Sequence, residues 1–192
     1  MGAKYDPPLV DLCTQVRTLA NSTLHLPQSV TVRIRPQAVM RSVLGHLAAQ
    51  GVQRYAKGPI TEPLRDYLLA TTQALPPQIR LYYWLYPYRT QILVRDAVKG
   101  DFRTHLSVAF WLMKFFPLAF MVTFDEPPGR LYPSLGNLDV CGADPFGREH
   151  TISLPLRPLI HRAWPEHPTD SEVIVSGPQA VTGRPLTRIV RT

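Results

Sequence analysis

A run of nineteen residues, Leu106 to Phe124, is almost wholly apolar, and its interpretation decides what this chain can fold into. Its length matches a transmembrane helix, which needs about 20 apolar residues. However, Lys114 lies near the middle, where a charge costs about 3 kcal/mol on insertion scales. Pro117, three residues later, cannot continue a helix. We therefore expect two buried elements, a helix followed by a strand, with a membrane span as the alternative.

Local patterns predict the remaining elements. The twenty prolines are about twice the usual share, so the elements should be short. Apolar residues recur at helical spacing in three N-terminal segments, and they alternate with polar residues from Ser29 to Arg35. Aromatic and β-branched segments on either side of Pro87 predict a hairpin. The expected helices cover 8–20, 37–55, 62–75 and 101–116, and the expected strands cover 29–35, 79–86, 90–97, 118–124, 151–154, 173–175 and 186–190.

Together these segments predict an α+β fold in a single domain covering residues 1–192. We expect the N-terminal helices to pack on a mainly antiparallel sheet, followed by an irregular, Pro-rich C-terminal part. The length is typical of one domain. A composition of 45% hydrophobic and 18% charged residues is that of a folded core rather than a disordered chain.

Positive charge is concentrated in the first half of the chain. Residues 1–100 hold twelve Lys or Arg and five Asp or Glu, a net charge of +7, whereas residues 101–192 hold nine of each. Arg outnumbers Lys by seventeen to four. Arginine makes forked contacts to phosphate and carboxylate, although a GC-rich coding sequence would produce the same bias. The asymmetry favours one basic face that attracts a polyanion.

Six basic residues are the candidates for this face. Arg33 and Arg35 are two positions apart on a predicted strand, so both side chains should point away from the core. The other four lie in or beside predicted turns. A solvated surface explains any single one of them, but not the regional excess. The predicted polyanion-binding residues are Arg33, Arg35, Lys57, Arg95, Lys99 and Arg103.

Motifs for catalysis and metal binding are weak, and we predict a non-enzymatic protein without a cofactor. Ser134 lacks the first glycine of a nucleophile elbow. His150, His161 and His167 do not have the spacing of a zinc finger, and no cysteine pair accompanies them. We expect no catalytic residues and no metal ligands.

The order of segments resembles that of a known family. A basic strand, Val30 to Ile34, precedes a long helix. A Lys57-Gly58 turn precedes a second helix, which ends in prolines, and an aromatic and basic hairpin follows. Phe102-Arg103 then leads to a strand that ends in the sequence from Met121 to Glu126. Over residues 28–126 this order resembles the core of rhabdovirus-type viral matrix proteins.

The resemblance implies a structural protein under a viral envelope, located in the virion and at the inner face of the host membrane or in the host cytoplasm. Such a protein would condense nucleocapsids, bind anionic membrane peripherally and associate with itself. Two other functions stay open. One is an accessory structural subunit of a large complex, such as an organellar ribosome or a respiratory assembly. The other is a nucleic-acid-binding module, in which aromatic residues between Tyr82 and Tyr88 would stack on bases.

Overall fold

The computed structural model describes residues 2–22, 27–49, 61–70, 72–126, 132, 134–139, 147–168, 170–176 and 182–183. Three helices precede most of the strands, and all the strand pairs are antiparallel, so the predicted α+β fold is confirmed. The elements are α1 (Gly2–Ser22), β1 (Ser29–Ile34), α2 (Pro36–Ala49), α3 (Thr61–Leu69), β2 (Ile79–Leu85), β3 (Ile92–Asp101), β4 (Leu106–Phe115), β5 (Leu118–Phe124), β6 (Gly136–Asn137), β7 (His150–Pro155), β8 (Glu172–Ser176) and β9 (Thr182–Gly183).

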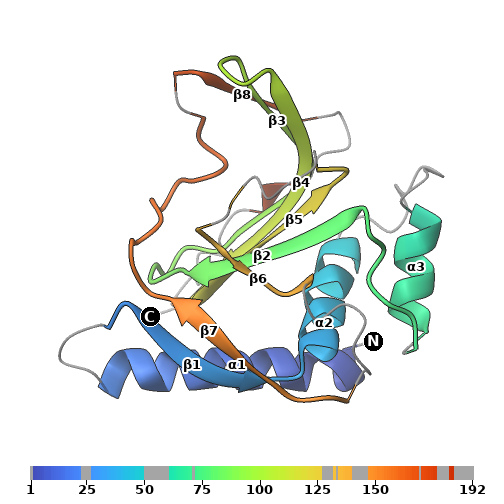
Figure 1. The fold of residues 1–192 in the computed structure, drawn as a ribbon, viewed down its shortest axis with the longest axis vertical. Helices are drawn as coiled ribbons and strands as arrows, with labels where there is room; N and C mark the ends of the chain where they lie inside the picture. The colour runs from blue at the N-terminus through green and yellow to red at the C-terminus, as the bar shows by residue number, and fades with distance from the viewer. Residues whose placement is uncertain are drawn as a thin grey trace, which may run out of the picture.

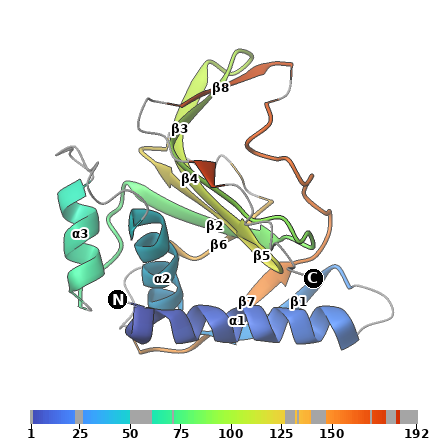
Figure 2. The ribbon, with the colours of Figure 1, turned by 180° about the vertical axis from the view of Figure 1, so that it is seen from behind.

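The strands form a large sheet and a separate two-stranded ribbon. The large sheet has the order β6-β2-β5-β4-β3-β8, and β9 also pairs with β3. β1 and β7 pair with each other and make the ribbon. In both ribbon views the β3–β8 end of the large sheet projects away from α1 and β1, at the opposite end of the molecule (Figures 1 and 2).

Both faces of the large sheet are covered over its central strands β2, β5 and β4. On one face, apolar side chains of the three helices and of the β1–β7 ribbon pack against β2, β4 and β5. On the other face lies an aromatic layer that includes Tyr82, Trp84 and Phe110. Residues 156–168, which we call the strap, cross this second layer, and Ile160 and Trp164 pack against it. The strap is part of the C-terminal region that the sequence predicts to be irregular.

The prediction of a helix over 101–116 is wrong, because Leu106–Phe115 forms strand β4. It turns at Phe116-Pro117 and pairs with β5, from Phe115 opposite Leu118 to Ala109 opposite Phe124. The predicted strand over 118–124 is confirmed. Asp101, the first residue of the predicted helix, accepts a hydrogen bond from the Arg103 backbone N–H in the β3–β4 turn, at 2.8 Å. No helix in the described ranges is both long and apolar enough to cross a membrane.

The prediction of a hairpin over 79–97 is also wrong, although both of its strands exist. β2 pairs with β5 and β6, whereas β3 pairs with β4, β8 and β9. Two strands, β5 and β4, therefore separate β2 from β3 in the sheet. The tight β4–β5 hairpin inserts between them and supplies hydrogen-bond partners to both.

The first and third helices differ in length from the predictions. α1 begins earlier than expected, and α3 ends at Leu69 rather than near residue 75. The fully buried Arg41 of α2 explains the second difference, because it donates hydrogen bonds to the carbonyl oxygens of Tyr67, Ala70 and Gln73, at 3.1, 3.0 and 2.9 Å. The Arg41 guanidinium thus takes the place of the backbone N–H donors that a longer α3 would supply to these carbonyl oxygens. The predicted parts over 50–55 and 186–190 lie outside the described residues.

Candidate polyanion-binding face

Strand β1 places Arg33 and Arg35 on the solvent side of the β1–β7 ribbon. Its inner residues Val32 and Ile34 are buried in the helix-side core, while Arg33 is exposed. Gln15 of α1 holds the free edge of β1: its amide accepts from the Arg33 N–H at 3.1 Å and donates to the Arg33 carbonyl at 2.8 Å. The backbone that carries Arg33 is therefore fixed on both edges, and its side chain points outward as predicted.

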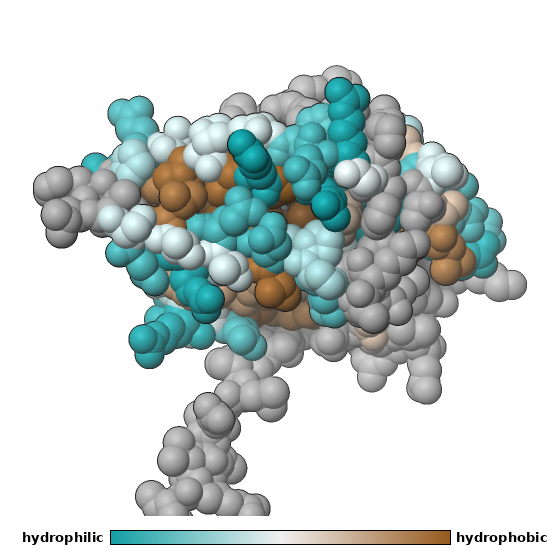
Figure 3. Space-filling model, turned by 90° about the horizontal axis from the view of Figure 1, so that it is seen from below, coloured by the Kyte–Doolittle hydropathy of each residue, from teal (hydrophilic) through white to brown (hydrophobic). Residues whose placement is uncertain are grey.

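Hydroxyl groups surround Arg33 on this outer face. Thr151 lies directly opposite Arg33, and Ser153 lies opposite Thr31. Residues directly opposite in an antiparallel pair project from the same face, and all of these side chains are exposed. Figure 3 looks onto this end of the molecule, where hydrophilic and near-neutral side chains alternate with apolar patches. The outer β1–β7 face consists of Ser29, Thr31, Arg33, Arg35, Thr151 and Ser153.

The two arginines differ in their partners. Arg35 forms an ion pair with Glu149 at 3.1 Å, and both side chains are more than half exposed. The guanidinium of Arg33 has no hydrogen bond or ion pair within the described part of the chain. Arg33 can therefore donate to an incoming phosphate without breaking an internal contact, whereas Arg35 shares its charge with a carboxylate.

Arg95 and Lys99 are not on an exposed face, which corrects their predicted placement. Their exposed fractions are only 4% and 5%. Arg95 lies over the Trp111 ring at 4.7 Å, and Lys99 pairs with Glu172 at 2.7 Å on the other side of the sheet. A β-bulge between Val94 and Ala97 interrupts the alternation of β3, so these two cations face opposite layers.

Arg103 is exposed, but it lies in the turn between β3 and β4, at the far end of the molecule from β1 (Figure 1). Lys57 lies outside the described residues. The structure therefore brings together Arg33 and Arg35 of the six predicted residues. It separates Arg103 from them and encloses Arg95 and Lys99.

A buried charge pair beneath the strap is not predictable from local sequence patterns. Lys114 of β4 is fully buried, and its Nζ donates to a Glu166 carboxylate oxygen and to the Arg162 carbonyl, both at 2.6 Å. Burial lowers the pKa of Lys114, and the hydrogen bond that Lys114 donates to Glu166 opposes that effect. Lys114 stands out in the sequence as a lone charge in an apolar run, but nothing local identifies Glu166 as its partner. The pair anchors the strap and is enclosed by protein.

Four of the five aromatic residues expected to stack on bases are buried, and Tyr88 is partly buried. Tyr82, Tyr83, Trp84 and Tyr86 lie in the two cores of the sheet. Tyr82 donates a hydrogen bond to Glu126 at 2.8 Å, and its pKa is raised by burial and by that carboxylate. Trp84 and Trp164 meet edge to face at 5.4 Å between ring centroids. These rings hold the layers together and are not accessible to a nucleic acid.

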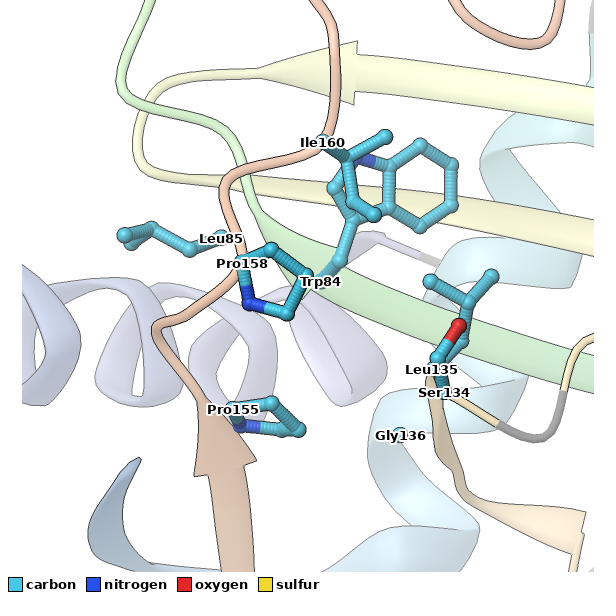
Figure 4. Close-up of a pocket in the computed structure, with 8 residues that line it drawn as sticks. All are labelled: Trp84, Leu85, Ser134, Leu135, Gly136, Pro155, Pro158 and Ile160. Carbon is cyan, nitrogen blue, oxygen red and sulfur yellow. The ribbon is translucent and has the colours of Figure 1, made fainter. Parts of the chain in front are cut away.

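A small pocket opens beside the strap, away from Arg33. Figure 4 shows its lining of Trp84 and Leu85 from β2, Pro155, Pro158 and Ile160 from the strap side, and Ser134 to Gly136. Its volume of about 10 Å³ leaves room for about one water molecule. The buried Trp84 Nε1–H, which has no acceptor among the described residues, is a suitable donor to such a water. The pocket is too small for a metabolite.

No protein-family model, curated protein or solved structure matches this chain. Among the described residues, no three His, Cys, Asp or Glu side chains are grouped so that they could hold a metal ion. The functional proposal below therefore depends on the residues of the outer β1–β7 face.

Proposed function

We propose that this chain is a non-enzymatic assembly protein that binds a phosphate-bearing polyanion through its outer β1–β7 face. The observation that carries the proposal is the exposed guanidinium of Arg33, which has no partner among the described residues and lies beside Arg35 and a row of hydroxyl groups. A guanidinium matches phosphate with two parallel N–H donors, and Ser or Thr hydroxyls can supply further donors. Binding of this kind requires hydrogen bonds and charge attraction but no catalytic group.

An assembly protein of viral matrix type would use such a face on nucleocapsid RNA or on anionic membrane. Both ligands present rows of phosphates, so this chemistry does not discriminate between them. The burial of Tyr82 and Trp84 argues against recognition of bases by stacking. We therefore propose backbone or headgroup contacts, with binding in the virion and at the inner face of the host membrane.

Replacing Arg33 and Arg35 together with serine should weaken polyanion binding about tenfold or more, because each basic side chain near an anionic surface contributes about 1 kcal/mol. Binding should be measured separately with single-stranded RNA and with phosphatidylserine vesicles, over a salt series. The variant should also show a shallower salt dependence, because fewer counterions are released.

Arg103→Ser is the matched control for this experiment, since it removes an exposed arginine at the other end of the molecule. We expect it to bind like the parent. If the double variant binds both ligands as tightly as the parent at low salt, the face is not the binding site. Loss of binding to only one ligand identifies which source of phosphate it recognises.

Replacing Glu149 with glutamine should strengthen polyanion binding about fivefold. The change releases Arg35 from its carboxylate partner and removes a negative charge from the edge of the face, an effect of about 1 kcal/mol near an anionic surface. Stability should change little, because the Arg35–Glu149 pair is exposed. Glu62→Gln on α3 is the control, and equal strengthening in both variants would contradict a local effect.

A further inference from the structure

β8 is an edge strand of the large sheet, and its outer edge is well formed. Among the described strands β8 pairs only with β3, from Ala97 opposite Ser176 to Asp101 opposite Glu172. The Phe102 N–H donates to the Ser171 carbonyl at 2.8 Å, so the backbone groups of Ser171 point toward β3. Because these directions alternate along a strand, the groups of Val173 and Val175 also face β3. Those of Glu172, Ile174 and Ser176 point away from the sheet.

An exposed apolar patch lies along this edge. Val173 and Val175 of β8 and Val98 of β3 are exposed, and Val98 is directly opposite Val175. Val173 lies opposite Gly100, in contact with the space that a Cβ would occupy there. Residues directly opposite each other project from the same face, and the β3–β8 end of the sheet lies beyond the part that the helices cover (Figures 1 and 2). Phe102, in the turn directly after β3, is also exposed.

Two other sheet edges in the described structure have a feature that discourages pairing. The free edge of β1 is occupied by the Gln15 amide, and β6 has only two residues. β8 has neither feature. Its one charged residue, Glu172, is engaged by Lys99, and the strand contains no proline or lysine. Proteins usually blunt an edge strand of this composition unless another strand pairs with it.

We propose that β8 pairs with β8 of a second copy of this chain, antiparallel and centred on Ile174, so that two sheets join into one. In this register Ile174 lies opposite its own counterpart, and Val173 lies opposite Val175 of the other copy. Glu172 lies opposite Ser176 of the other copy, so no like charges meet. The two-fold axis makes each contact occur twice, which is the condition for a closed dimer.

The same register completes the apolar patch. Across the joined sheets, Val98 and Val175 of one copy lie in a row with Val173 and Gly100 of the other. The two-fold axis generates a second, equivalent row. The outward backbone groups of Glu172, Ile174 and Ser176 form the hydrogen-bonded pairs of the new ladder. A second copy therefore pairs the backbone groups of the edge and also buries the apolar patch. A membrane would bury the patch but leave the backbone groups of the edge unpaired, so a second copy is the favoured partner.

The first test is a pair of matched substitutions. Val175→Lys places a charge at the centre of the proposed contact, whereas Val10→Lys makes the same change on α1, and the two valines have similar exposed fractions, 59% and 61%. Light scattering over a concentration series should show a dimer for the parent and for Val10→Lys. Val175→Lys should weaken dimerisation by about tenfold or more while its circular dichroism and melting curve stay close to those of the parent.

The second test uses disulfide formation to measure the register. Val173 and Val175 of the other copy form a non-hydrogen-bonded pair, with Cα atoms about 4.5 Å apart, a separation that a disulfide can bridge. In a background of Cys13→Ala and Cys141→Ser, the double variant Val173→Cys/Val175→Cys should give a cross-linked dimer under mild oxidation. Either single cysteine variant should give much less, because neither position lies opposite itself.

A parent chain that stays monomeric at every concentration overturns the proposal. So does dimerisation that Val175→Lys leaves unchanged, or cross-linking no greater in the double cysteine variant than in the single variants. If the parent is monomeric but needs Val175 to bind vesicles, the patch is a membrane contact and the proposal is wrong. Arg33→Ser/Arg35→Ser should still dimerise, so failure of polyanion binding and failure of dimerisation are separate results.

Discussion

Replacing Arg41 with alanine should lower the free energy of unfolding by about 4 kcal/mol. The guanidinium is fully buried, donates to carbonyl oxygens of the α3 region, and lies over the Tyr67 ring at 4.0 Å. It also hydrogen-bonds the side chain of Gln37. Its removal leaves several buried acceptors without a donor, each worth about 1–3 kcal/mol, together with a cavity between α2 and α3. A typical domain has only about 5–15 kcal/mol of stability.

Denaturant unfolding monitored by circular dichroism measures this loss. Arg17→Ala removes an exposed arginine from α1 and is the control, with an expected change below about 0.5 kcal/mol. Arg41→Lys should fall between the two, because an ammonium group cannot reach all the acceptors that a guanidinium fork reaches. A loss below about 1 kcal/mol for Arg41→Ala would show that water replaces the guanidinium at little cost.

Replacing Glu166 with glutamine should lower the free energy of unfolding by about 3 kcal/mol. The change leaves the ammonium of Lys114 buried without a negative partner, and breaking one side of a buried ion pair costs about 3–5 kcal/mol. The strap should loosen as well, because Glu166 and the Arg162 carbonyl hold it to β4 through Lys114. Hydrogen exchange at residues 161–168 measures that loosening.

Lys114→Met is the matched comparison, because it removes the buried charge and keeps an unbranched apolar side chain. We expect it to cost less than Glu166→Gln, and the double variant should be more stable than Glu166→Gln alone. If Lys114→Met lowers the free energy of unfolding more than Glu166→Gln does, the attraction within the ion pair outweighs the cost of burying its charges. That result would contradict the view that the unpaired ammonium is the main source of the loss.

The same pair gives stability a pH dependence. Burial lowers the pKa of Lys114 in the folded protein from its ordinary 10.5. Between the lowered pKa and 10.5 the unfolded chain binds a proton that the folded chain does not, so the contribution of Lys114 to stability rises with pH across that interval. Glu166→Gln removes the negative charge that helps to hold the pKa of Lys114 up, so the interval should extend to lower pH. Melting temperatures from neutral to alkaline pH, compared with Lys114→Met, test this.

Local sequence patterns determined the elements that have one apolar and one polar side. In β1, Val32 and Ile34 alternate with Thr31 and Arg33, and a shift of one residue would place the arginine in the core. The outward direction of Arg33 and Arg35 therefore followed from the sequence alone, as did the positions of the N-terminal helices. In each case, the same few residues specify both the element and its orientation.

Tertiary structure decided the elements that are buried on both sides. In β4, Phe110 and Leu112 face the aromatic layer while Trp111 and Met113 face the helices. No alternation of apolar and polar residues distinguishes such a strand from a buried helix. The separation of β2 from β3 was also decided by tertiary structure, because the β4–β5 hairpin lies between them and pairs with both.

The burial of the remaining cations also depended on distant partners. Lys99 reaches Glu172, Lys114 reaches Glu166, and Arg95 lies over Trp111 beside a bulge. A charge near a predicted turn has the pattern of a solvated residue until the chain brings a carboxylate or an aromatic ring to it. The sequence therefore determined where positive charge is abundant. Only the packing of the helices, the strap and β8 on the sheet decided which of those charges stay exposed, because a buried cation needs a partner that no local pattern specifies.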